Sequence, residues 1–279
     1  MAVTLKKELE DIFQYSNAYF LAFSATTGSV CFGWDITLMS GILVLPSFQK
    51  YFGLLSESAS ARASLSGNVI SILQAGAFCG ALSSSYFSSR FGRKRSLLAS
   101  AVIFLVGNII QSTIGIGMSP HVALKVLYFS RFFAGIGLGL LSSLVPMYIS
   151  ECAPRTIRGR CLGGIPVGIS IGNMLAYWVN YSVSRNISPR QMQWRLPVII
   201  QLIPGALFLC FMLFQPESPR WLVERGHYEE AAAVLAYIAR KDQDDDAVVL
   251  TLNEIRADFV GRNNLSLLTQ IPSVYLVLP

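Results

Sequence analysis

Six apolar stretches dominate the hydrophobic pattern of this chain of 279 residues. They lie at residues 18–43, 66–88, 97–117, 124–147, 161–182 and 196–215. A helix needs about 20 predominantly apolar residues to cross the hydrocarbon core of a bilayer. Lipid offers no partners to open backbone groups, so segments that span it must be helical. The pattern therefore predicts an all-α membrane protein with six transmembrane helices.

The polar segments around these stretches divide the rest of the chain. Residues 1–17 are polar and carry mixed charge, and residues 18–217 hold the six-helix transmembrane bundle. Residues 218–262 alternate apolar and charged positions at helical spacing, which predicts one or two amphipathic helices at the cytoplasmic face. Residues 263–279 form an apolar tail that is too short to span and is broken by Pro272, and we interpret it as a truncation.

Composition supports the membrane interpretation. Hydrophobic residues make up 53% of the chain and charged residues 14%, whereas a soluble domain carries roughly a quarter charged residues. The net charge of +6 does not indicate nucleic-acid binding, because the basic clusters are short, flank apolar segments and lack interleaved aromatic residues. The lipid bilayer is therefore the expected partner of this surface.

The lysines and arginines between the spans predict an orientation. About eleven fall on one side of the membrane and about six on the other. Cytoplasmic loops carry the excess of such residues, so we expect both termini in the cytoplasm.

Small residues recur at fourfold spacing on three of the predicted spans. The repeats are Gly76 and Gly80 on the second span, Gly135 and Gly139 on the fourth, and Gly164, Gly168 and Gly172 on the fifth. Such faces let helix backbones approach closely, so they predict a tightly packed bundle rather than helices that merely pass through lipid.

Two ionisable residues lie inside the apolar stretches, Asp35 in the first and Arg131 in the fourth. Their predicted depths differ by only about 5 Å, so the two side chains are placed to form an ion pair in the outer half of the bundle. Charges at membrane depth usually mark a transport pathway. Arginine stays protonated, so Asp35 is the partner expected to titrate. The alternative is a fixed pair that only sets helix register.

A second group of charged residues lies in the loops expected in the cytoplasm. Two acids, Glu151 and Glu217, sit among several arginines, and charge-assisted pairs between helix ends can latch one conformation. Positive-inside anchoring is the simpler alternative, but it accounts only for the arginines. The candidate gate residues are Arg90, Gly92, Arg93, Glu151, Arg155, Arg158, Arg160, Glu217 and Arg220.

These motifs, in this order, resemble the sugar porter branch of the major facilitator superfamily. The matching pieces are the Gly-Trp-Asp run at 33–35, the loop at 90–94, Arg131 with the glycines that follow, the Pro-Met-Tyr-Ile-Ser-Glu run at 146–151 leading into 158–160, and residues 216–222. The Gln-Trp-Arg-Leu-Pro run at 193–197, with Gln201 nearby, is similar to fungal members, including carriers of quinate-like solutes.

The resemblance implies a carrier of two six-helix halves, of which this chain is the N-terminal one. It implies alternating access to a small-molecule solute, a sugar or a similar polyol or ring acid, bound between the halves. It also implies that Asp35 accepts a proton beside Arg131, that the loop motifs form the cytoplasmic gate, and that the carrier lies in the plasma membrane. No cofactor is expected.

Three departures from the family pattern affect these expectations. Ser89 stands where the loop motif usually begins with an aspartate, and Pro166 stands where the fifth helix often has a sugar-binding glutamine. Asn173 is the polar candidate for substrate binding that remains on that helix, with an interhelical hydrogen bond as its alternative role. The third departure is that no second half is present, so we expect this chain to be inactive alone.

Two other classes of function compete with a carrier. A non-transporting nutrient sensor or a regulatory half-transporter would share the bundle, although the long cytoplasmic tail typical of such sensors is not found in this sequence. A membrane-embedded enzyme needs clustered catalytic groups, but His121 and His227 are isolated in loops predicted on opposite sides. The sequence therefore indicates a protein that is not an enzyme.

Overall fold

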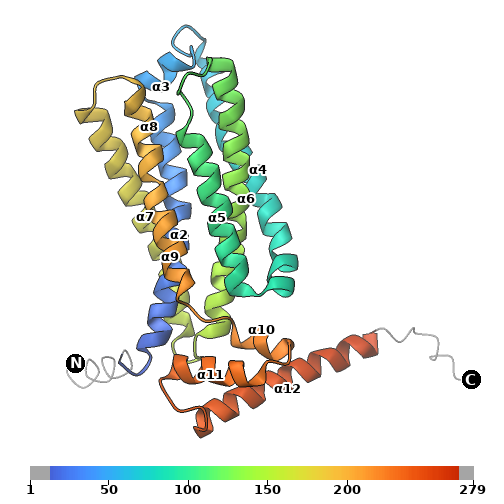
Figure 1. Cartoon of the computed structure of the whole chain (residues 1–279). Helices are drawn as coiled ribbons and strands as arrows, with labels where there is room; N and C mark the ends of the chain where they lie inside the picture. The colour runs from blue at the N-terminus through green and yellow to red at the C-terminus, as the bar shows by residue number, and fades with distance from the viewer. Residues whose placement is uncertain (1–12, 270–279) are drawn as a thin grey trace, which may run out of the picture. The chain divides into compact units, whose positions relative to one another are not determined.

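The computed structural model describes residues 13–269, with side chains for residues 13–261, and this part of the chain contains helices but no strand (Figure 1). It divides into two compact units. One unit is the helical bundle at Tyr19–Pro216, and the other combines the residues up to Ala18 with those from Glu217 onward. Most of the predicted apolar tail lies outside the described residues.

Five helical segments of the described chain are long and apolar enough to cross a membrane. They are α4 (Ala59–Phe91), α5 (Arg93–Ser112), α6 (Pro120–Cys152), α7 (Arg158–Asn186) and the pair α8 (Gln191–Ile200) and α9 (Leu202–Leu213), which together form one span. The first predicted span forms a helix of 28 residues, α2 (Ser16–Leu43), but does not belong to this set. Its serines, threonines, glycines and Asp35 dilute its apolar residues, so the sixth span remains a prediction.

The predicted glycine faces bring α4 and α6 into backbone contact. A Cβ atom on Gly76 or Gly80 of α4 would overlap the carbonyl oxygen of Phe132 or Ile136, and one on Gly139 of α6 would overlap that of Ala77. On its other side α6 packs against α5, where a Cβ on Gly137 would overlap the backbone of Phe104. The prediction of a tightly packed bundle is therefore confirmed here.

A second glycine contact joins α7 to α2. A Cβ on Gly172 of α7 would overlap the carbonyl oxygen of Val30, and one on Gly33 of α2 would overlap that of Ile169. Asn180 of α7 adds hydrogen bonds of 3.2 and 3.1 Å from its amide nitrogen to the carbonyl oxygens of Thr37 and Leu38. These contacts fix the rotation of α2 against α7 and so decide which way Asp35 points.

The last span is interrupted at Gln201, between α8 and α9. Pro204 has no N–H to bond the carbonyl oxygen of Ile200, and its ring crowds that oxygen, which explains the break. Near the start of the span, Trp194 packs against α3 (Pro46–Tyr51), where its ring lies 5.7 Å from that of Phe48.

The unit that begins at Glu217 contains three helices, α10 (Pro219–Glu224), α11 (Tyr228–Ala239) and α12 (Asp246–Thr269). Leu222, Val223 and Ala231 form a small core beneath Leu252 and Ile255. Within the same unit, Arg240 donates to the carbonyl oxygen of Phe13 and the hydroxyl of Ser16. The prediction of one or two amphipathic helices therefore underestimated this segment by at least one helix.

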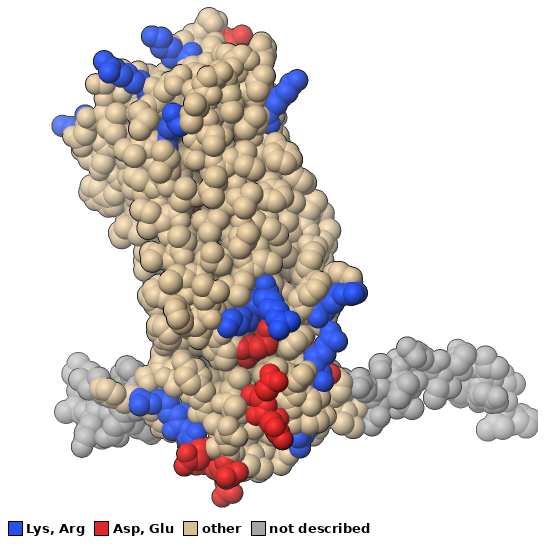
Figure 2. All heavy atoms as spheres, in the orientation of Figure 1, with Lys and Arg blue, Asp and Glu red and all other residues tan. Residues whose placement is uncertain are grey.

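On the face of the bundle shown in Figure 2, lysines and arginines gather towards its two ends and the surface between them is free of exposed charge. This distribution is the one expected of a surface surrounded by lipid, because charged side chains are costly at membrane depth.

Candidate functional site

A buried ion pair joins α2 to α6 at the centre of the bundle. The Nη1 of Arg131 donates to both carboxylate oxygens of Asp35, at 2.9 Å to Oδ1 and 2.8 Å to Oδ2. Asp35 is 0% and Arg131 1% exposed. The structure therefore brings together the two residues that the sequence analysis paired by depth.

Gln201 is the third member of this cluster. Its side-chain Nε2 donates to Oδ1 of Asp35, and the residue is 1% exposed. In the sequence, Gln201 belongs to the similarity with fungal members and carries no predicted role. The sequence does contain a signal for a role of Gln201. It is an amide inside an apolar span, three residues before Pro204, where a proline is expected to interrupt the helix.

The stability of the cluster depends on the presence of all three side chains. Removing both ions from water is costly, and their attraction offsets this only when the hydrogen bonds are well formed. Removing one partner from a buried pair typically costs about 3–5 kcal/mol, because the other charge is left uncompensated. A change in the charge of Asp35 therefore alters the contacts that join α2 to α6 and to the break between α8 and α9.

The candidate substrate residue Asn173 lies on α7 and contacts α2. Its Oδ1 accepts a hydrogen bond of 2.9 Å from the hydroxyl of Thr37, two residues after Asp35. Asn173 therefore makes the interhelical bond named as its alternative role, and substrate binding by Asn173 remains a prediction. Pro166 is exposed on the same helix and lines a shallow hollow of about 360 Å³ with Ser170 and Met174.

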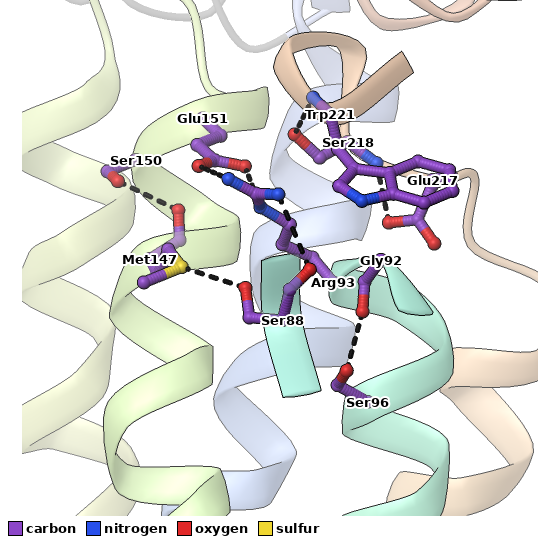
Figure 3. Close-up of polar contacts among 10 residues, drawn as sticks. All are labelled: Ser88, Gly92, Arg93, Ser96, Met147, Ser150, Glu151, Glu217, Ser218 and Trp221. Carbon is purple, nitrogen blue, oxygen red and sulfur yellow. Dashed lines mark hydrogen bonds and ion pairs between the residues drawn. The ribbon is translucent and has the colours of Figure 1, made fainter. Parts of the chain in front are cut away.

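At one end of the bundle, Arg93 and Glu151 form the second ion pair of the site (Figure 3). The guanidinium of Arg93 contacts the carboxylate twice: Nη2 donates to Oε1 at 2.9 Å, and Nε lies 2.8 Å from Oε2 as an ion-pair contact. Gly92 precedes Arg93 with φ of 94°, a conformation that favours glycine, and makes the turn between α4 and α5. Ser96 caps this turn by donating to the carbonyl oxygen of Gly92 at 2.6 Å.

Each charge of this pair is unfavourable for its own helix. Arg93 is the first residue of α5, where the helix dipole disfavours a cation, and Glu151 lies in the last turn of α6, where it disfavours an anion. The two side chains are only 10% and 12% exposed. The pair is therefore stabilised by its tertiary contact and not by local sequence.

The remaining candidate gate residues have different surroundings. Arg90 donates to the hydroxyl of Tyr86 at 3.2 Å, within α4. Arg158 holds the carbonyl oxygen of Ala153 with two bonds of 3.3 Å, and Arg155 lies in the same α6–α7 connection. Arg160 lies in the first turn of α7.

Glu217 and Arg220 belong to the other compact unit. The carboxylate of Glu217 accepts from the backbone N–H of Ser218 at 2.9 Å, and the hydroxyl of Ser218 caps α10 by accepting from the N–H of Trp221 at 3.4 Å (Figure 3). Arg220 lies in the first turn of α10. Among the candidate gate residues described above, Arg93 and Glu151 form an ion pair with each other, and both belong to the helical bundle.

Comparisons with known proteins agree with this architecture. The sequence model of the family described as "Sugar (and other) transporter" matches residues 21–270. The chain is 39% identical over 243 residues to the quinate permease of Neurospora terricola, covering 86% of this chain and 44% of that protein. It is also 39% identical over 226 residues to the probable quinate permease of Neosartorya fischeri, covering 81% of this chain and 41% of that protein.

Solved structures give the same result. The proton:xylose symporter XylE bound to 6-bromo-6-deoxy-D-glucose matches with a TM-score of 0.79 and 31% identity, covering 88% of this chain and 53% of that one. The inward-open xylose transporter XylE from E. coli matches with a TM-score of 0.75 and 30% identity, covering 87% and 56%. The chain thus spans about half the length of the relatives that it matches. The chain belongs to the sugar (and other) transporter family of the major facilitator superfamily, a family of permeases and not of enzymes.

Proposed function

We propose that this bundle is the N-terminal half of a proton-coupled carrier for a sugar, a polyol or a ring acid such as quinate. The family and the names of the relatives support a solute of this kind. In the proposed carrier the solute binds between this half and a second half, and the carrier alternates between outward and inward access. Asn173 is the proposed solute contact on α7.

The observation that carries this proposal is the buried contact of Asp35 with Arg131. Arginine keeps its proton at any physiological pH, so only the aspartate can change charge. Protonation removes the negative charge and weakens the attraction that joins α2 to α6. A proton that reaches Asp35 from one side of the membrane therefore favours a different arrangement of the helices from the one that an ionised Asp35 holds.

The Arg93–Glu151 pair is the proposed gate at the cytoplasmic end. This assignment follows from the excess of lysine and arginine on that side, which also favours cytoplasmic termini. Insertion in the plasma membrane is proposed from the family resemblance alone. The pair joins the start of α5 to the end of α6, so its opening loosens the contact between these two helices.

Transport assays with matched variants test the proton coupling. Yeast cells that lack their own carriers for the solute express this chain together with the C-terminal half of the Neurospora terricola quinate permease, and cells that express the chain alone are measured beside them. We expect concentrative uptake of radiolabelled quinate or hexose only with both halves, and we expect a protonophore to abolish it.

Asp35→Asn is the diagnostic variant, because asparagine keeps the size of the side chain and cannot titrate. We expect this variant to lose concentrative uptake, whereas the exchange of solute across the membrane continues. Asp242→Asn, which changes an exposed carboxylate outside the bundle, is the control and accumulates solute like the parent. Unchanged concentrative uptake by Asp35→Asn would exclude Asp35 as the proton-coupling group.

A further inference from the structure

The two groups that contact the Asp35 carboxylate differ in what they offer it. In the part of the chain that the structure describes, the carboxylate of Asp35 accepts hydrogen bonds from the side chains of Arg131 and Gln201. A guanidinium has five donors and no acceptor, whereas a side-chain amide has two donor hydrogens on nitrogen and an acceptor on oxygen. Gln201 is therefore the member of the cluster that can both donate to Asp35 and accept from it.

This difference matters once Asp35 carries a proton. The carboxylic acid then has an O–H that needs an acceptor, because a buried donor without a partner is costly. Arg131 cannot accept it. The Oε1 of Gln201 is buried and has no hydrogen-bond partner in the arrangement described, so it is available for that bond.

The surroundings leave few other groups for this task. The residues of α7 that pack against this stretch of α2, Ile169, Gly172 and Asn173, carry no charge, and the Oδ1 of Asn173 already accepts from Thr37. Helix α6 contributes Arg131. On α2 itself, Cys31 lies one turn before Asp35 and is buried. Gln201 lies at the break between α8 and α9, and from there its side chain reaches Asp35.

We propose that Gln201 is the positioning residue of the proton site. Its side-chain amide rotates when Asp35 gains a proton, so that Oε1 takes the place of Nε2 beside the carboxyl group. With ionised Asp35, Nε2 donates to the carboxylate, and with protonated Asp35, Oε1 accepts from the carboxylic acid. The inference rests on the proton-coupling role proposed for Asp35 and adds the group that satisfies both of its states.

Infrared difference spectroscopy tests this inference without transport. The purified full chain in lipid nanodiscs is brought from mildly alkaline to mildly acidic pH, and the C=O stretch of the protonated carboxyl that disappears in Asp35→Asn is assigned to Asp35. An acid whose O–H lacks an acceptor absorbs at higher frequency than one whose O–H is hydrogen-bonded. We therefore expect this band to move to higher frequency in Gln201→Met, which keeps an unbranched side chain of similar length without the amide.

Gln215→Met is the matched control, because Gln215 is equally buried and bonds the neutral hydroxyl of Ser24. We expect the Asp35 band to stay in place in this control. If Gln201→Met fails to fold, Gln201→Asn replaces it, since its amide is one methylene too short to reach Asp35, and we expect the same upward shift. In the two-half transport assay, Gln201→Met should slow concentrative uptake by roughly two- to tenfold relative to exchange, the effect of one lost hydrogen bond.

The outcomes separate this inference from the proposed function. An Asp35 band at the same frequency in the parent and in Gln201→Met would overturn the role of Gln201. The absence of any Asp35-dependent band would overturn it too, because Asp35 would then take up no proton. A shifted band in a protein without proton-driven uptake would support the role of Gln201 and refute proton-coupled transport.

Discussion

Glycine-to-alanine exchanges on α4 test the packing that holds the bundle together. Gly67, Gly76 and Gly80 lie on the same helix, but a Cβ at Gly67 meets nothing within 4 Å, whereas a Cβ at Gly80 overlaps the carbonyl oxygen of Ile136. One methyl group therefore has opposite consequences at two positions of one helix. Gly80→Ala is the perturbation and Gly67→Ala its matched control.

The expected magnitudes follow from the two environments. At Gly67 only helix propensity changes, and replacing glycine by alanine stabilises a helix by up to about 1 kcal/mol. At Gly80 the same gain is outweighed, because the overlapping atom belongs to the backbone of α6 and cannot rotate away. Overpacking of this kind typically costs about 1–3 kcal/mol. The propensity gain is common to both variants, so we expect their free energies of unfolding to differ by the overpacking cost of about 1–3 kcal/mol.

Unfolding of the purified chain in mixed micelles, followed by tryptophan fluorescence as the denaturing detergent fraction rises, measures this difference. We expect Gly80→Ala to unfold at a lower fraction than the parent and Gly67→Ala at the same or a higher one. Gly76→Ala, which meets the carbonyl oxygen of Phe132, should resemble Gly80→Ala. Equal stability of Gly80→Ala and Gly67→Ala would refute the conclusion that α4 and α6 are in backbone contact.

Two further predictions concern charged residues. Glu151→Gln leaves the mostly buried Arg93 without its anion, so we expect the free energy of unfolding to fall by about 1–3 kcal/mol in the same assay. The double variant Arg93→Gln/Glu151→Gln should lose less stability than the sum of the single variants. Strict additivity would mean that the pair is not coupled. In the unit that begins at Glu217, the pKa of Asp245 is lowered because its carboxylate accepts from Lys241 and from the backbone N–H of Ala247. A lowered pKa stabilises the fold above the ordinary carboxyl pKa, and this contribution is lost as the pH falls through the lowered value. Amide hydrogen exchange in the first turn of α12, corrected for intrinsic rates, should therefore quicken in acid, and this acid sensitivity should disappear in Asp245→Asn; the same sensitivity in that variant would assign it to another group.

Much of the fold could be predicted from the sequence because the relevant signals are local. Five of the expected spans are long, apolar helices, and the fourfold glycine spacing on α4, α6 and α7 marks faces that do pack closely. The sixth span stays a prediction, since α2 combines Asp35 with many small polar residues and so has a weak hydropathy signal. The pairing of Asp35 with Arg131 could be predicted from their depths because the rise per residue of a helix is constant.

The sequence by itself determined the helical, membrane-spanning character of the chain, the faces that pack and the charges placed inside the spans. The tertiary structure decided which of those charged and polar groups meet. Gln201 reaches Asp35 across 166 positions and Arg93 reaches Glu151 across 58. Such contacts depend on the rotation of each helix about its axis and on where a proline interrupts it. Periodicity shows which residues share a face but not which face of another helix they meet, and only the packing of the whole bundle supplies that.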